Sequence, residues 1–423
     1  MLSMADTMSR AAASTRSLVR RAARSAARRI RDFVEPEPVG IDLAAVTEAD
    51  IALHFADGPH KFYQLMPWLA VLRQRPELRV IIVARQPESY EPLTKLTDVP
   101  IALVPKFDAL MALYDRANFR AVLYVNNSYT NFQSLAFQQA VHIHVNHGES
   151  DKICMVSNQA KAYDRVFVAG QAAVDRHAAA LAWFDTTHLT RVGRPQLDLV
   201  VDNPLTQWDG PTITYAPTWE GEDEANNYTS IDHYGLAIIE AALAQPGARV
   251  IYKPHPRIPE SDTAAVRSAH QAIVAALKGA SSEAGHRVCL NEDILGVIRG
   301  TDLFIGDVSS VTLDHLYLRP QAPIMLTDRR SDRERLRADT PVASAASVID
   351  ANTLSSLAPD MGRLLTQDPL AAARRSVRDY YFDGLGPGES TQRFWTALEA
   401  AMSEHDRAVA NLKRVRITAA EVA

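Results

Sequence analysis

The chain has 423 residues, 47% of them hydrophobic and 22% charged, which is ordinary for a soluble globular protein and long enough for two domains. Its only two cysteines, Cys154 and Cys289, lie far apart without metal-ligand spacing. This composition argues against a disulfide framework or a structural zinc site, and it suits a reducing cytoplasm. No apolar run approaches the ~18–20 residues of a transmembrane helix.

Positive charge is concentrated at the start of the chain. Residues 1–31 contain eight arginines and one acid, a net charge of +7, and because the whole chain carries −5, the remaining residues carry −12. A weakly apolar helical face that includes Val19, Ile30 and Phe33 lies opposite most of these arginines. We expect residues 1–35 to be a basic amphipathic arm that binds an anionic membrane surface, which places the protein peripherally at the inner face of the plasma membrane. A transit peptide and a disordered tail are the alternatives.

Strands and helices alternate from residue 50 onward, which is typical of a doubly wound parallel sheet. We expect a first, acceptor-side Rossmann-like domain over residues 44–203. The expected strands are 51–55, 79–84, 101–104, 121–125, 141–145 and 165–168, and the expected helices are 62–73, 90–96, 109–116, 131–139 and 171–181.

A polar stretch with Pro204 and Pro211 marks the expected domain boundary, and the alternation then begins again. We expect a second, nucleotide-binding Rossmann-like domain over residues 210–395, followed by a C-terminal helix and tail over 396–423. The expected strands are 212–215, 249–253, 287–290, 302–306 and 323–326, and the expected helices are 232–244, 263–277, 293–299 and 311–318. The rest, to about residue 410, is expected to be helical. The predicted fold class is α/β, with two Rossmann-like domains facing a cleft.

Polar groups follow three expected strands of the second domain, in the runs APTW (216–219), KPHPR (253–257) and GDVSS (306–310). The carboxyl ends of parallel strands emerge at one edge of the sheet, where such folds bind ligands. Cationic side chains, hydroxyls and the N-terminus of the helix after GDVSS would together suit a diphosphate. The residues that supply these groups are Thr218, Lys253, His255, Arg257, Ser309 and Ser310. A simple N-cap serine or a solvated strand edge is the alternative.

In the first domain, His147 and Gly148 follow the strand at 141–145 and are expected to face the same cleft. A histidine near its usual pKa is well suited to remove a proton from an alcohol. His142 and His144 alternate on the strand itself and are expected to pack. A zinc site made of these three histidines is disfavoured by their spacing, and the sequence indicates neither a metal nor a cofactor.

The order of motifs resembles the CDP-glycerol glycerophosphotransferase family of teichoic-acid-type polymer synthesis. The resemblance spans about residues 120–330 and is carried by five motifs. These are His147-Gly148 with Lys152; Gly193, Pro195 and Asp198; Tyr215–Trp219; Lys253–Pro256; and Asp307, Ser309, Ser310, Val311 and Asp314.

The resemblance implies a GT-B-like fold and the transfer of glycerol phosphate or ribitol phosphate from a CDP-activated donor to a lipid-linked polyol-phosphate or saccharide acceptor, with release of CMP. His147 would be the general base and His255 a second catalytic residue. Other residues are assigned by side. The donor side would comprise Thr218, Lys253, Arg257, Asp307, Ser309, Ser310 and Asp314, and the acceptor side Gly148, Lys152, Arg194 and Asp198. No nucleic acid partner is expected.

Several positions depart from the family pattern, notably Glu149 and Asp151 beside the expected base, Gln196, and Glu220 after Trp219. They leave the acceptor and the transferred polyol open. A GT-B glycosyltransferase that uses a nucleotide sugar for surface polysaccharide is the alternative enzyme. A non-catalytic nucleotide-binding protein at the membrane is the alternative from another class.

Overall fold

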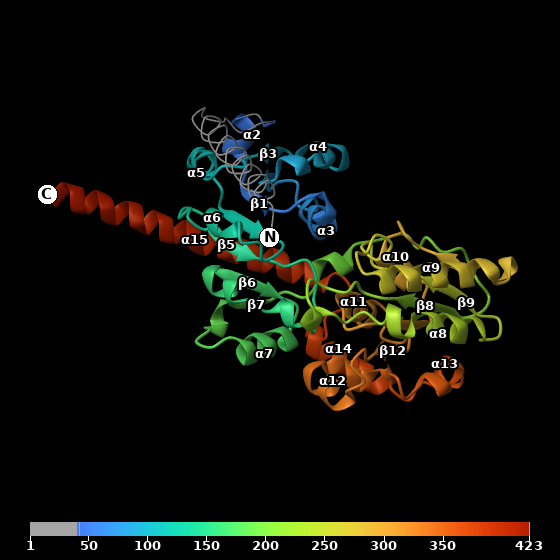
Figure 1. Cartoon of the computed structure of the whole chain (residues 1–423). Helices are drawn as coiled ribbons and strands as arrows, with labels where there is room; N and C mark the ends of the chain where they lie inside the picture. Colours follow the sequence, from blue (N-terminus) through green and yellow to red (C-terminus); the bar gives the residue numbers. More distant parts are fainter. Residues whose placement is uncertain (1–39, 42, 423) are drawn as a thin grey trace, which may run out of the picture.

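The computed structural model describes residues 40, 41 and 43–422, so the expected basic arm lies outside the described residues. The described chain forms two parallel sheets with helices on both faces, and it confirms the α/β fold class (Figure 1). No helix in this part of the chain is both long and apolar enough to cross a membrane.

The first sheet has seven strands in the order β3-β2-β1-β4-β5-β6-β7, all parallel. Its strands are β1 (Ile51–Phe55), β2 (Val80–Ala84), β3 (Ile101–Leu103), β4 (Ala121–Tyr124), β5 (Val141–His144), β6 (Arg165–Val168) and β7 (Leu189–Arg191). The helices between them are α2 (Leu43–Glu48), α3 (Phe62–Leu72), α4 (Pro87–Leu96), α5 (Phe107–Arg116), α6 (Asn131–Ser134) and α7 (Gln171–Ala180). Short β7 was not expected from the sequence, and α6 ends earlier than expected.

The second sheet has six parallel strands in the order β10-β9-β8-β11-β12-β13, the order of a dinucleotide-binding fold. Its strands are β8 (Thr212–Ala216), β9 (Arg249–Tyr252), β10 (Arg287–Val288), β11 (Leu303–Gly306), β12 (Ile324–Thr327) and β13 (Ser347–Ile349). Its helices are α8 (Ile231–Leu243), α9 (Ala264–Gly279), α10 (Ile294–Arg299), α11 (Ser310–Leu318), α12 (Arg333–Asp339), α13 (Leu357–Thr366) and α14 (Ala371–Phe382).

The expectation that the chain after residue 326 is entirely helical was wrong, because β13 adds an edge strand beside β12. Its three residues, Ser347–Ile349, are too few to show an alternating or continuous apolar pattern. Pairing with a strand that is already present stabilises a segment that the local sequence does not mark.

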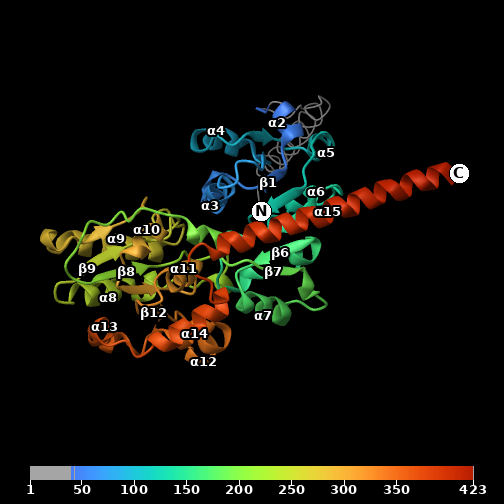
Figure 2. The same ribbon diagram turned by 180° about the vertical axis from the view of Figure 1, so that it is seen from behind.

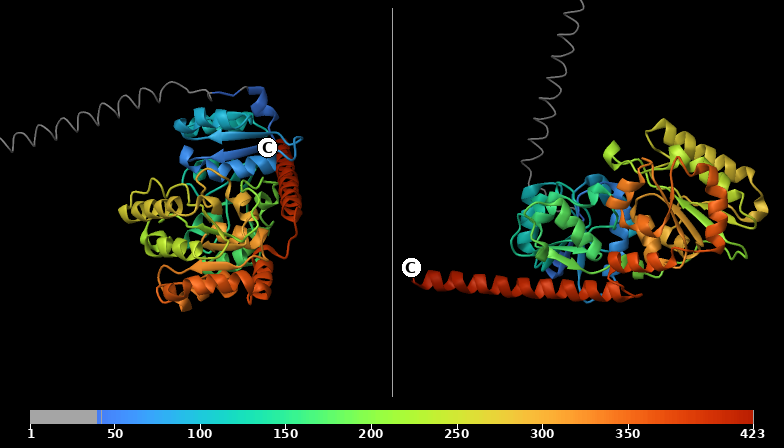
Figure 3. Two further views of the ribbon diagram at one scale, coloured as in Figure 1. Left: turned by 90° about the vertical axis from the view of Figure 1, so that its right-hand side faces the viewer. Right: turned by 90° about the horizontal axis from the view of Figure 1, so that it is seen from below.

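The last helix, α15 (Glu389–Val422), leaves the second domain and returns to the first (Figures 1 and 2). Phe394, Trp395 and Leu398 are buried in the same apolar cluster as α3 and the strands β1, β4 and β5. Each fully buried side chain of this size contributes about 1.5–3 kcal/mol through removal of apolar surface from water. The helix then runs past the edge of the first domain (Figure 3). The first domain is therefore built from both ends of the described chain.

Candidate active site

The three polar strand ends of the second domain meet, because β9, β8 and β11 are neighbours in the sheet. Asp307 follows β11 and is buried beneath these strand ends. Its fully buried carboxylate accepts hydrogen bonds from the Thr218 amide (2.6 Å) and the Thr327 hydroxyl (2.5 Å). Burial raises the pKa of this carboxyl group, and its two hydrogen bonds hold the Thr218 backbone and Thr327 in place. The donor-side role expected for Asp307 stays a prediction.

The serine turn begins α11, and it differs from an ordinary helix cap. Ser309 occupies the N-cap position, but its side chain makes no capping hydrogen bond, and its buried Oγ has no hydrogen-bond partner among the described residues. The free N–H groups of a helix N-terminus favour an anion. Beside this turn, Lys253 Nζ donates to the Leu290 carbonyl at 3.2 Å, and burial lowers the pKa of its ammonium group. This edge therefore offers a hydroxyl, backbone amides and a cation without a carboxylate partner.

The hydrogen bonding of His255 determines its tautomer. Its Nδ1 lies 3.2 Å from the backbone nitrogen of Arg257, which can only donate, so Nδ1 is the acceptor and Nε2 carries the proton. The guanidinium of Arg257 lies over the Trp219 ring, 3.6 Å from its centroid, and pairs with exposed Glu222 at 3.2 Å. Arg257 thus lies at the rim, whereas His255 presents an N–H donor.

His147 is presented by a turn that the sequence only hints at. Asn146 adopts a left-handed conformation (φ 52°), which asparagine tolerates better than most residues. Its side chain accepts from the His147 amide at 2.8 Å, and the Trp68 indole donates to its carbonyl. His147 Nδ1 lies 3.1 Å from the Val125 carbonyl, which can only accept, so Nδ1 carries the proton and Nε2 is free to accept one.

The two histidines lie close together although they come from different domains. Tyr63, at the start of α3, packs edge-on against both rings, with centroid distances of 5.9 Å to His147 and 5.9 Å to His255. Burial lowers the pKa of His147 to about 4 and, together with the cations Lys152, Arg257 and Lys253, lowers that of His255 to about 3. Both imidazoles are therefore neutral at pH 7, one as a proton acceptor and the other as a hydrogen-bond donor.

Gly148 and Lys152 of the first domain contact the second domain. A Cβ atom at Gly148 would lie 3.1 Å from Ser310 Cβ, so this glycine permits close approach, and the sharp turn falls at Asn146 instead. Lys152 Nζ donates to Thr218 Oγ1 at 2.9 Å. The loop after β5 thus brings the Lys152 ammonium group to the second domain beside Thr218, and its expected role at the acceptor stays a prediction.

Three further residues from the family motifs connect the domains. Arg194 pairs with Asp314 of α11 at 3.0 Å, and burial raises the pKa of Asp314 to about 6 in spite of that pair. Asp198 accepts from the Thr391 amide at 2.7 Å and the Tyr317 hydroxyl at 3.1 Å. These contacts hold the two domains together, and the roles expected for Arg194 and Asp198 at the acceptor and for Asp314 at the donor stay predictions.

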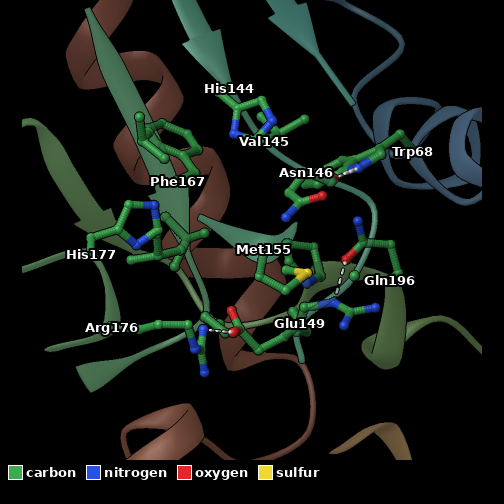
Figure 4. A pocket seen from close by; sticks show the side chains of 18 residues that line it. Trp68, His144, Val145, Asn146, Glu149, Met155, Phe167, Arg176, His177 and Gln196 are labelled. Carbon is green, nitrogen blue, oxygen red and sulfur yellow. Dashed lines mark hydrogen bonds and ion pairs between the residues drawn. The ribbon is translucent and has the colours of Figure 1, made fainter. Parts of the chain in front are cut away.

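The acids beside His147 turn away from it. Arg176 of α7 binds Glu149 (2.5 Å) and Asp151 (2.7 Å), and Tyr381 of α14 donates to Asp151. Figure 4 shows Arg176 and Glu149 at a cavity of about 30 Å³ behind the His147 loop, near His144. Such a volume fits about one or two water molecules and no nucleotide. The departure at Glu149 and Asp151 is therefore matched by the partly buried Arg176, which pairs with both acids.

Sequence reasoning missed the groups that orient the two histidines. Val125 and Arg257 act through backbone atoms, which no motif displays, and Tyr63 lies in a region without a polar pattern. An asparagine directly before His147 could have indicated the turn, because asparagine tolerates the left-handed conformation that Asn146 adopts. Within residues 40–41 and 43–422, no cluster of three or more histidine, cysteine or acidic side chains could hold a metal ion.

Two Rossmann-like domains whose carboxyl edges meet define a protein of the GT-B type, and comparison with solved structures supports this class. A variant of the wall teichoic acid polymerase TagF soaked with CDPG is similar with a TM-score of 0.57 and 15% identity, over 86% of this chain and 91% of that one. A putative UDP-N-acetylglucosamine 2-epimerase from Listeria monocytogenes gives a TM-score of 0.58 and 15% identity, over 84% and 97%. At these identities the likeness concerns the fold.

The family model for CDP-Glycerol:Poly(glycerophosphate) glycerophosphotransferase matches residues 73–329. The chain belongs to this family, which confirms the resemblance drawn from its motifs, and it is an enzyme of the glycerophosphate transferase class. No curated protein matches the chain.

Proposed function

We propose that the enzyme transfers glycerol phosphate or ribitol phosphate from a CDP-activated donor to a hydroxyl of a lipid-linked acceptor and releases CMP. The observation that carries the proposal is the pair of neutral histidines on opposite domains, with a free acceptor nitrogen on His147 and a donor N–H on His255. Family membership supplies the donor class.

In the proposed reaction His147 Nε2 takes the proton of the acceptor hydroxyl, whose oxygen attacks the phosphorus that bears the polyol. The bond from this phosphorus to the CMP oxygen breaks, and CMP leaves with both electrons of that bond. The N–H of His255, the ammonium groups of Lys152 and Lys253 and the serine turn stabilise the charge that develops on the phosphates. Because these donors are already in place, little reorganisation accompanies the reaction.

The direct test is incubation with CDP-glycerol, CDP-ribitol and a set of UDP- and CMP-sugars, together with a membrane extract as acceptor source. We expect nucleotide release with a CDP-polyol, measured as CMP. Turnover of nucleotide sugars alone would assign the enzyme to the glycosyltransferases instead.

Donor binding should depend on His255 and on the serine turn. Charge-assisted hydrogen bonds to phosphate are worth about 1.5–3 kcal/mol, so His255→Ala, and the pair Ser309→Ala with Ser310→Ala, should each weaken CMP binding at least about tenfold and slow turnover. Isothermal titration calorimetry with CMP measures this, with His233→Ala on the outer helix α8 as the control. Unchanged CMP affinity in both variants would contradict the binding of the donor diphosphate at this edge.

Membrane association through residues 1–34 belongs to the same proposal. Its support is the +7 charge of residues 1–31 and the spacing of Val19, Ile30 and Phe33, which would share one face if the segment were a helix. A protein that lacks residues 1–34 should no longer sediment with vesicles that contain anionic lipid, and binding of the full chain should weaken as salt is raised. Equal sedimentation of the two proteins would contradict the arm's role and leave the catalytic proposal standing.

A further inference from the structure

The surface next to His147 on the first domain carries no net formal charge. It is made by the loops after β1, β4 and β5, which are residues 56–61, 125–130 and 145–148. Apart from histidines, the charged side chains of these loops are Asp57 and Lys61. These two pair with each other at 2.8 Å, and both are partly buried. We call these three loops the acceptor surface.

The donor edge, in contrast, is positively charged. Lys152 donates to a threonine hydroxyl and Lys253 to a backbone carbonyl, so both cations have neutral partners. A cation with a neutral partner keeps its attraction for phosphate, whereas a cation paired with a carboxylate has lost most of it. The site therefore provides for anionic phosphates on the donor edge and for an uncharged group on the acceptor surface.

Two further cations of the first domain, Arg85 and Arg194, are already bound to other groups. Arg85 follows β2 and binds the Val104 and Pro105 carbonyls and Gln133. Arg194 is paired with Asp314. A chain of phosphates leading to His147 would therefore meet Asp57 and would find Lys61 and Arg194 already paired with carboxylates.

Amides and aromatic rings make up the acceptor surface and its border. Asn126 Nδ2 donates to Asp57 Oδ2 (2.8 Å) and to Gln64 Oε1 (2.7 Å), and Gln64 donates to the Tyr63 hydroxyl at 3.1 Å. The Oδ1 atom of Asn127 is buried without a hydrogen-bond partner among the described residues. Tyr129 is 86% exposed and Tyr63 is 45% exposed.

These groups match the chemistry of a sugar ring. A pyranose presents C–H groups that pack on the electron-rich face of an aromatic ring, and a rim of hydroxyls that pair with amides and carboxylates. We infer that the acceptor presents an uncharged saccharide hydroxyl to His147, not the end of a polyol phosphate chain. This inference rests on the proposed function, because it concerns the second substrate of that reaction.

The test compares two acceptors with CDP-glycerol as donor, followed by CMP release. One is a set of octyl glycosides of glucose, N-acetylglucosamine and their disaccharides, and the other is an octyl-linked tri(glycerol phosphate). We expect kcat/KM to be at least tenfold higher for the best neutral glycoside. Equal use, or preference for the anionic oligomer, overturns the inference while the proposed transferase stands. CMP binding without CMP release from any acceptor overturns the proposed function, and the inference falls with it.

A variant isolates the electrostatic argument. Asp57→Asn leaves Lys61 without its carboxylate, and should shift the ratio of the two kcat/KM values at least about fivefold toward the anionic acceptor. Using the ratio within one variant cancels any change in His147. The matched control is Glu91→Gln, which removes the carboxylate of Lys95 from an equivalent i,i+4 pair of 2.8 Å on outer helix α4. If both variants leave the ratio unchanged, the surface does not select the acceptor by charge.

The aromatic part of the surface has its own measurement. Tyr129→Ala should raise the KM for the neutral glycoside at least about fivefold and leave CMP affinity unchanged. Trp183→Ala removes an equally exposed ring that lies after α7 and is the control. A Tyr129→Ala enzyme with an unchanged KM overturns the assignment of this ring to the acceptor.

Discussion

Replacement of His147 by alanine should lower kcat by about 10²–10⁴ and leave CMP affinity nearly unchanged. This range is the usual contribution of positioned acid–base catalysis. The reason is specific to the geometry, because Val125 holds the Nδ1 proton and leaves Nε2 as the acceptor nitrogen near the donor edge. Single-turnover CMP release and calorimetry with CMP separate the two effects.

The control is His233→Ala, which removes a histidine from the outer surface of the second domain. Activity should also stay level from pH 8 to pH 6. Burial lowers the pKa of His147 to about 4, so its neutral, proton-accepting form persists well below the usual range of imidazole. A general base with the usual pKa of histidine would instead lose activity as pH falls through about 6.5. A folded His147→Ala enzyme with a near wild-type rate would contradict the proposal that His147 is the general base.

The second large effect is loss of stability in mild acid. Three histidines, His54, His144 and His315, are at least 96% buried, and burial lowers the pKa of each, to about 3 for His144 and His315. An unfolded chain binds protons on histidine below pH 6.5, whereas the folded chain does not until far lower pH. The free energy of unfolding is therefore complete above pH 6.5 and falls as pH drops from there toward the folded-state values.

The size of the effect is considerable. At pH 5, His144 and His315 each cost about 2 kcal/mol relative to neutral pH, or about 4 kcal/mol together, against a typical total stability of about 5–15 kcal/mol. The lowered pKa of His54 acts in the same direction. Urea titrations monitored by circular dichroism between pH 7.5 and pH 5 measure this. His315, which stacks on Phe304 at 4.6 Å, provides the variant. His315→Phe should reduce the acid loss at pH 5 by about 2 kcal/mol, and surface His233→Phe should leave it unchanged. Stability that is constant down to pH 5 would contradict the argument.

The sequence predicted where the strands β8, β9 and β11 of the second sheet end and that these polar strand ends lie side by side. Prolines in KPHPR and small residues in GDVSS mark strands that end in turns, and parallel topology alone brings β9, β8 and β11 together. The alternation of His142 and His144 on β5 indicates packing, and both are buried. Such features depend on short stretches of sequence and on rules of topology that hold for the whole fold class.

Other features depend on partners distant in the chain. Asp307 belongs to a family motif, but its hydrogen-bond partners are Thr218 and Thr327. These two residues lie elsewhere in the sequence, and no local pattern shows that they contact Asp307. Lys152 lies five residues after His147, and only the path of its loop shows that it reaches the second domain. Motifs thus identified the residues that matter, while three-dimensional contacts showed which of them hold the domains together.

The return of α15 to the first domain bears on how the protein is made. During synthesis the strands of the first domain leave the ribosome more than two hundred residues before Phe394, Trp395 and Leu398, which complete their apolar cluster. One apolar cluster of the first domain is complete within residues 46–173, but the face beside α3 stays partly uncovered until α15 has been made, after α14 of the second domain. The face of the first sheet beside α3 is therefore covered only after the strands of both domains have been made.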